Sequence, residues 1–239
     1  VPSALVNDSR HVRDALLGAG RVAGEGNSIW GQALGSWGGA DDSNGLAELD
    51  TNHKGAMAGV NFGREDISGG IGAGFSKADY DMRDRGSNAE ADSKFVGAHI
   101  GFDEGPLGLR FGGAYAWHDI DATRTVSFPG FTGAPESSYD ATTRQLFGEA
   151  SYNIAYGPAS VAPFARLASI RTSTDGFDES GGASALTLDN DARDVQLLSL
   201  GVRASTVTPL SANATIEPRA SIAWQHGWGD LGGRSTAAF

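Results

Sequence analysis

Few side chains in this chain of 239 residues are spaced as a catalytic or nucleotide-binding site requires. Gly70, Gly72 and Gly74 have the spacing of a phosphate-binding loop, but the strand-like pattern continues through them and no helix follows. Ser180 precedes two glycines without the G-x-S-x-G turn that exposes a hydrolase nucleophile. We therefore predict neither a dinucleotide site nor a serine hydrolase in this chain.

Metal ligands are equally sparse, because the chain contains five histidines and no cysteine. The histidines lack the short spacings and the cysteine or carboxylate partners of a zinc site; they are His11, His53, His99, His118 and His226. We predict no metal ion and no cofactor. A net charge of −11 also argues against a nucleic-acid partner, since phosphate binding needs a basic face.

Two groups of polar residues stand out by position instead. Charged residues occupy one face of several strand-like segments, and they are Arg110, Glu149, Arg166, Arg203, Glu217 and Arg219. A second group lies in an amphipathic segment near the N-terminus and comprises Asn7, Arg10, Arg13 and Asp14. Buried charges need partners or water, so we expect these groups to pair across strands or with each other.

Residues 3–19 form the one segment with helical periodicity in a chain that otherwise resembles strands. Leu5, Val12 and Leu16 share one helical stripe, and a glycine at position 18, followed by another at position 20, predicts the end of the helix. Its length of roughly 25 Å approaches the ~30 Å thickness of a membrane, but it is too polar to face lipid. We expect a helix enclosed by strands.

Nine segments are predicted as strands: 28–37, 54–63, 67–80, 93–102, 107–118, 142–154, 161–171, 195–205 and 214–225. The connections between them alternate between long and short. Outer-membrane barrels have short periplasmic turns and long extracellular loops, whereas soluble sandwiches have no reason to alternate in this way. The sequence therefore predicts an all-β fold, an antiparallel transmembrane β-barrel with an N-terminal α-helix in its lumen.

Alternation within the strands supports this interpretation. In residues 107–118 the odd positions are mostly large and apolar and the even positions are small or charged, as in strands with an apolar outer face. A soluble barrel with the apolar face inside remains the alternative. Glycines assigned to the inner face would leave room for a helix of ~10 Å diameter; they are Gly70, Gly72, Gly74, Gly97, Gly101, Gly108, Gly112, Gly148 and Gly201.

Seven segments in order resemble the translocator (β) domain of classical monomeric autotransporters, the type Va secretion systems. They are LVNDSRHVRDALL at 5–17, IWGQALGSWGG at 29–39, YAWHDIDATRTVSFPGF at 115–131, FGEASY at 147–152, DGFDESGGASAL at 175–186, LGVRA at 200–204 and AWQHGWGD at 223–230. The resemblance implies a twelve-stranded, monomeric barrel that anchors an N-terminal passenger and mediates its export through the outer membrane of a Gram-negative bacterium. It implies three partners, namely outer-membrane lipid, the covalently attached passenger and the barrel assembly machinery.

The chain departs from that family in its strand number. Only nine strands are complete, and residues 235–239 look like the start of a tenth, so we expect a barrel truncated at its C-terminus. We expect a lumenal helix and linker over residues 1–27 and the barrel over 28–239. An open sheet edge in lipid would leave unpaired backbone groups, so this segment should not close by itself.

Two alternatives to a plain conduit remain. One is a non-secretory porin or structural barrel, against which the helix and the inner glycines argue. The other is self-cleavage, which the resemblance suggests because some autotransporters release the passenger by attack of a lumenal asparagine on its own backbone. Asn7, with Glu149 as the barrel carboxylate, is the candidate, but its flanking residues do not match the self-cleaving subgroup. We expect no enzymatic activity from the domain.

Overall fold

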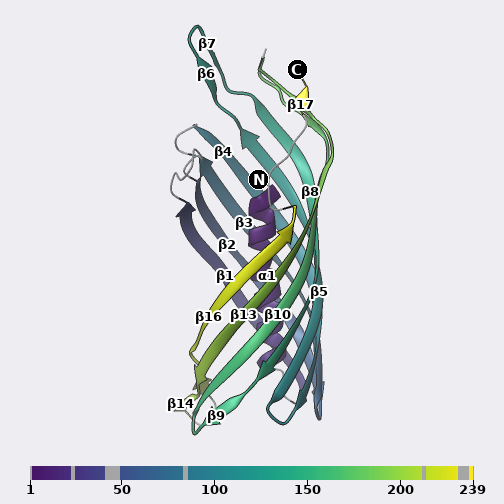
Figure 1. Ribbon diagram of the computed structural model, residues 1–239, viewed down its shortest axis with the longest axis vertical. Helices are drawn as coiled ribbons and strands as arrows, with labels where there is room; N and C mark the ends of the chain where they lie inside the picture. The colour runs from purple at the N-terminus through teal and green to yellow at the C-terminus, as the bar shows by residue number, and fades with distance from the viewer. Residues whose placement is uncertain are drawn as a thin grey trace.

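A computed structural model describes residues 2–22, 25–40, 49–82, 86–182, 184–211, 214–230 and 237–238. In these residues one helix, α1 (Pro2–Val22), precedes seventeen strands. The sheet of long strands curls around α1, which lies against its concave face (Figure 1). The all-β fold with an internal N-terminal helix is confirmed.

Nine long strands follow one another in the main sheet in chain order, and each pairs with the next in antiparallel fashion. They are β1 (Gly26–Ala40), β2 (Leu49–Arg64), β3 (Ile67–Met82), β4 (Ser87–Glu104), β5 (Leu107–Thr123), β8 (Glu136–Tyr152), β10 (Ala159–Thr174), β13 (Asp191–Thr206) and β16 (Arg219–Gly229). These are the nine predicted strands. Because each strand runs antiparallel to the next, the connections after β2, β4, β8 and β13 lie at one end of the sheet, the short-turn end, and those after β1, β3, β5 and β10 lie at the other, the long-loop end (Figure 1). The predicted alternation of lengths is wrong at two connections, since four residues, 83–86, join β3 to β4, whereas twelve, 207–218, join β13 to β16.

Most strands extend further toward the long loops than the sequence predicts. Residues 81–92 are predicted to be a loop, yet β3 continues to Met82 and β4 begins at Ser87. The prediction is wrong because the convex face of β4 carries Asn88, Glu90 and Asp92 here, so the segment resembles a charged loop, while Ala89 and Ala91 are buried on the concave face and the backbone ladder continues.

Short strands lie at both ends of the main sheet. At the long-loop end are β6 (Val126–Phe128), β7 (Phe131–Gly133), β11 (Phe177–Asp178), β12 (Thr187–Leu188) and β17 (Ala237–Ala238), and at the short-turn end are β9 (Ile154–Tyr156), β14 (Thr208–Ser211) and β15 (Ala214–Ile216). The predicted tenth strand over 235–239 does not extend the main sheet, because β17 pairs with β12 instead. Its other residues lie outside the described part of the chain.

The two faces of the sheet have the polarity that the sequence predicts. In β5, Phe111 and Trp117 lie on the convex face and are half exposed, whereas Arg110 and His118 are buried on the concave face. Large apolar side chains on the convex face of other strands are exposed as well, for example Leu146 at 71%. This is the arrangement of a barrel whose outer surface faces lipid.

Gly148 is wrongly assigned to the inner face. A Cβ atom added to Gly148 would lie 3.0 Å from Phe111 Cδ1, on the convex side, whereas the next residue, Glu149, is buried at 3% exposure. Successive strand residues point to opposite faces, so the two could not both lie inside.

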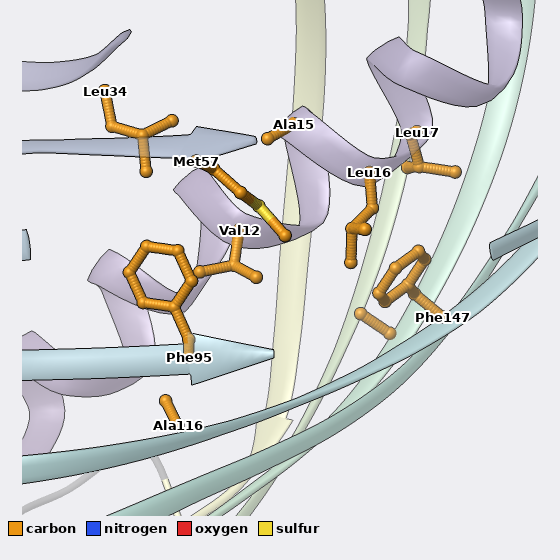
Figure 2. Close-up of a cluster of buried hydrophobic side chains, with 10 residues drawn as sticks. Val12, Ala15, Leu16, Leu17, Leu34, Met57, Phe95, Ala116 and Phe147 are labelled. Carbon is orange, nitrogen blue, oxygen red and sulfur yellow. The ribbon is translucent and has the colours of Figure 1, made fainter. Parts of the chain in front are cut away.

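The helix is held to the sheet by its apolar stripe. Leu5, Val12 and Leu16 are buried, as the periodicity predicts. Figure 2 shows the larger of the two clusters that they enter, in which side chains of α1 meet residues of six strands; it contains Val12, Ala15, Leu16, Leu17, Leu34, Met57, Phe95, Ala116, Phe147 and Ala168. Leu5 packs nearer the long loops, with Tyr80 and Ile120 among its neighbours.

The helix continues past the predicted stop and ends at Val22. Gly18 and Gly20 do not terminate it, because its last turn is stabilised by the sheet: Asn61 Nδ2 donates a hydrogen bond of 3.0 Å to the carbonyl of Ala19. A Cβ atom on Gly20 would lie 2.9 Å from His99 Cδ2, so a side chain would not fit there without displacing His99.

In the described residues, β1 and β16 are the two edges of the main sheet and do not pair with each other. β1 begins at Gly26, two residues before the expected start of the barrel segment. Among the described residues, no helix combines the length and hydrophobicity needed to cross a membrane.

Candidate functional site on the concave face

The charged residues of the concave face gather around Glu149 of β8. Its carboxylate accepts hydrogen bonds from Arg21 at the end of α1 (Nη2–Oε1, 2.9 Å), from Arg166 of β10 (Nη2–Oε2, 2.8 Å) and from Arg203 of β13 (Nη2–Oε1, 3.2 Å). Asp14 of α1 accepts a further bond of 2.6 Å from Arg166 Nη1. We call these five residues the anchor cluster.

The anchor cluster follows from strand register. Glu149 lies directly opposite Arg166, so both point to the concave face, and Arg203 comes from the next strand along the sheet. The Glu149 side chain is 1% exposed. A buried carboxylate is stable only when it is paired, and three guanidinium groups with two carboxylates leave one positive charge in excess, by formal charge. The ring of Phe164 lies 4.7 Å from the Arg203 guanidinium carbon and offsets part of that excess by a cation–π contact.

The other end of α1 is fixed by a second set of polar contacts. Tyr80 of β3 donates a hydrogen bond of 2.5 Å from its hydroxyl to Asp8 Oδ2. The His11 ring stacks on His53 of β2, with centroids 4.4 Å apart, and its Nε2 lies 3.1 Å from Ser36 Oγ. Contacts from three strands therefore define the rotation of the helix about its axis.

Gln145 of β8 forms two hydrogen bonds with the middle of the helix. Arg13 Nη1 donates to Gln145 Oε1 at 2.9 Å, and Gln145 Nε2 donates to the backbone carbonyl of Ser9 at 2.9 Å. Both Arg13 and Gln145 are buried. Leu16 fits against Gly97 of β4, where a Cβ atom would lie 2.5 Å from Leu16 Cδ1. Polar and apolar contacts thus alternate along the whole helix.

The expected meeting of the two polar groups occurs at some of the proposed positions. Asp14 meets Arg166, while Arg13 meets Gln145 rather than a charged partner. Asn7 and Arg10 are exposed and line an open cleft of about 540 Å³ between α1 and the last strands of the sheet. Their roles stay predictions.

The remaining proposed residues do not reach the helix. Arg110 is buried, as its phase predicts, but its Nη2 donates to Asp103 Oδ1 at 2.8 Å near a short turn. Arg219 Nη2 donates to Glu217 Oε2 at 2.7 Å. This bond holds the pKa of Glu217 below its usual value, so the pair persists at neutral pH and is lost as the pH falls through that lowered pKa.

Sequence reasoning missed Arg21, Tyr80 and Gln145. Arg21 lies beyond residue 19, the predicted end of the helix, and belongs to its last turn in the structure. Gln145 and Glu149 are four residues apart in β8, so their side chains point to the same face of the sheet. Applying the alternation to neutral polar residues as well as charged ones therefore predicts Gln145 on the concave face. Tyr80 alternates in step with Ser68 and Ser76 in β3, so the same reasoning places it on the concave face, although it does not identify Asp8 as its partner.

This arrangement holds a helix and offers little for catalysis. In the described ranges, no group of three or more His, Cys, Asp or Glu side chains could bind a metal ion. Glu149 contacts Arg21, which lies fourteen residues after Asn7. Asn7 and Arg21 are therefore about 21 Å apart along the helix axis. Glu149 therefore cannot assist an attack by the Asn7 side chain in this arrangement.

Comparisons with known proteins agree on one family. Residues 29–239 match the family described as the autotransporter beta-domain. Two proteins of Serratia marcescens, both described as extracellular serine proteases, are 31% and 29% identical over 242 and 240 residues. Each alignment covers 96% of this chain but only 23% of the relative, so the chain spans about a quarter of their length.

Two solved structures share the fold. The translocator domain of the autotransporter NalP from Neisseria meningitidis matches with a TM-score of 0.75 and 18% identity, covering 99% of this chain and 80% of that one. The beta domain of the Bordetella autotransporter BrkA matches with a TM-score of 0.66 and 15% identity, covering 87% and 81%.

Proposed function

The chain belongs to the autotransporter β-domain family and is a translocator domain of the Gram-negative outer membrane, and we propose that α1 closes its lumen as a plug after export. The domain is a transport barrel that exports a passenger. In this proposal, α1 is the segment that joins the passenger to the barrel. Residues 1–27 would form the plug and linker, and 28–239 the barrel.

One observation carries the proposal, namely that α1 is fixed at both ends and along its middle. Arg21 is bound by Glu149, Asp8 by Tyr80 and Arg13 by Gln145. A segment in transit would need only transient contacts, whereas buried, paired charges hold one position. A porin would leave this face to water, so the occupied concave face argues against that alternative.

The test replaces residues 2–22 by a glycine–serine segment of equal length in the full-length protein. Such a segment of 21 residues can extend over about 70 Å, so the chain can still cross the barrel while every helix contact is lost. We expect surface display of the passenger to continue and ion conductance in planar bilayers to rise. Conductance equal to that of the unaltered protein would overturn the plug.

We further infer that the domain works as a monomer in outer-membrane lipid and requires the barrel assembly machinery. The convex face exposes large apolar side chains, among them Ile71, Phe75 and Leu146. Such a surface supports our inference that lipid surrounds the domain. Depleting the assembly machinery should reduce the heat-modifiable form of the protein on gels, and a dimeric mass in detergent would contradict the monomer.

The relatives support a separate proposal about the passenger. Because both Serratia proteins are described as extracellular serine proteases, we propose that the passenger of this chain is one too. A fluorophosphonate probe should label a passenger-sized band on intact cells that express the full-length protein. No labelled band despite surface display would contradict this assignment.

A further inference from the structure

A groove of about 1,080 Å³ crosses the convex face of the sheet, on the side opposite the helix. Small outward residues form its floor, namely Ala58, Ala73, Ala98 and Gly113. Val60, Ile71, Val96 and Leu146 form its walls. Its volume is comparable with the largest small-molecule sites, which reach roughly 1,000 Å³. On a surface surrounded by lipid, an apolar groove of this size fits an acyl chain.

One end of the groove is cationic. Arg144 of β8 and Arg171 of β10 line it there, directly opposite each other in the strand register, with Tyr115 on the other side of Arg144. Asp194 of β13 also lines the groove, and its Oδ2 accepts a hydrogen bond of 3.0 Å from Arg171 Nη1, so this end carries one net positive charge. Arg144 is exposed and forms no ion pair or side-chain hydrogen bond with any residue that the structure describes. Like charges directly opposite each other destabilise a sheet, and Asp194 bonds Arg171 rather than Arg144.

This cationic end belongs to a ring at one level of the sheet. On five strands, the first charged residue of the convex face beyond the apolar stretch, counted from the short turns, is basic, whereas on β5 and β13 it is Asp119 and Asp194. The five basic residues are Lys54, Lys77, Lys94, Arg144 and Arg171, which we call the outer cation ring. The ring contains all three lysines of the chain, although the net charge is −11.

The ring repeats the feature seen at the groove. Lys54 lies directly opposite Lys77, a second pair of like charges, and Lys77 forms an ion pair with Glu90. In an outer-membrane barrel the short turns are periplasmic, so the ring lies at the outer edge of the apolar band. This is the level at which the phosphates of the outer leaflet lie.

From the groove and its charged end together, we propose that the convex face binds a phosphorylated glycolipid of the outer leaflet. One acyl chain lies in the groove, and the phosphate lies between Arg144 and Arg171. Planar guanidinium groups bind phosphate through paired hydrogen bonds, which suits two arginines better than two lysines at this position. The proposal concerns the lipid-facing surface and is independent of whether α1 acts as a plug.

The test measures binding to the full-length protein purified in detergent from outer membranes. The probe is lipid A that carries both phosphates, compared with the same lipid after enzymatic dephosphorylation, and the readout is the rise in unfolding temperature with lipid concentration. We expect the phosphorylated form to bind at least tenfold more tightly. Equal binding of the two forms would overturn the proposal, as would the same stabilisation by inorganic phosphate alone.

Three variants locate the site. Arg144→Gln should weaken binding of phosphorylated lipid A at least fivefold, and Ala98→Leu should weaken it by filling the groove while leaving every cation in place. Arg64→Gln removes an exposed arginine at the short-turn end of β2 and should leave binding unchanged. If Arg144→Gln and Arg64→Gln weaken binding equally, the attraction is non-specific and the site is wrong.

Discussion

Glu149 is the residue on which three arginine side chains depend for charge compensation. Removal of its charge in Glu149→Gln would leave Arg21, Arg166 and Arg203 facing one another, with Asp14 as the one other carboxylate that pairs with any of them among the residues that the structure describes. Breaking a buried ion pair by removing one partner costs about 3–5 kcal/mol. We expect a loss of that order in the free energy of unfolding, measured by urea denaturation of the refolded barrel.

Glu217→Gln is the matched control for this substitution. Glu217 also binds an arginine, Arg219, but its side chain is 33% exposed, and exposed pairs contribute about 0–1 kcal/mol. Equal effects of the two substitutions would show that the anchor cluster does not stabilise the domain beyond an ordinary surface pair.

Asn7 tests the self-cleavage alternative at the same scale. Its side chain is exposed, and Glu149 is bound to the far end of the helix. Asn7→Ala should therefore leave the amount and size of released passenger unchanged on immunoblots of culture medium. Loss of release would mean that this asparagine does chemistry that the observed arrangement does not provide for.

At the scale of single elements, the close approach of α1 to β4 depends on Gly97. A side chain there would meet Leu16 Cδ1 and also lie 2.9 Å from the carbonyl oxygen of Gly113. Gly97→Val should displace the helix at a cost of about 1–3 kcal/mol, the usual penalty for overpacking. The check is protease sensitivity of α1 in the folded barrel.

A double substitution separates helix packing from strand propensity. Leu16→Ala makes room opposite position 97, so Leu16→Ala with Gly97→Val should lose less stability than the sum of the two single changes. Gly31→Val is the control, since position 31 has no heavy atom closer than 4.0 Å to an added Cβ. Strict additivity of the two changes would rule out the proposed contact.

The sequence predicts strand existence well and strand ends poorly, for a reason visible in β3 and β4. Their lower parts alternate between lipid-facing apolar and inward polar residues, and this pattern identifies them. Toward the long loops the pattern reverses, with charged residues on the convex face and small apolar residues such as Ala89 and Ala91 on the concave face, so the outward-apolar pattern no longer marks where pairing stops. The same limit applies to α1, whose last turn is stabilised by Asn61 and the sheet rather than by its own residues.

The site is predictable only in part because strand phase gives the face of a residue and not its partner. Phase correctly places Glu149 and Arg166 on the concave face, where they meet. It places Arg110 there as well, in register with Glu149, but Arg110 binds Asp103 instead. The choice between two neighbours in register depends on side-chain geometry that a sequence pattern does not contain.

For the molecule as a whole, we infer that α1 remains on the concave face of the assembled translocator. Because the chain has no cysteine, an introduced pair reports on this position directly. A Cβ atom on Gly20 would lie 3.7 Å from His99 Cγ, and His99 Cβ is one bond beyond that atom, so the two Cβ atoms are at most about 5.2 Å apart, close to the ~4.5 Å upper end of the usual Cβ–Cβ separation in a disulfide. His118 lies on the next strand, β5, directly opposite Ser93 and not opposite His99. It therefore serves as the mismatched partner.

The most direct measurement is disulfide formation in intact cells that display the passenger. We predict that Gly20→Cys with His99→Cys forms a disulfide in most of the surface-exposed population, whereas Gly20→Cys with His118→Cys does not. A passenger displayed normally with neither pair oxidised, or with both oxidised equally, would contradict the inference, because the helix would then have left the position that its anchors define.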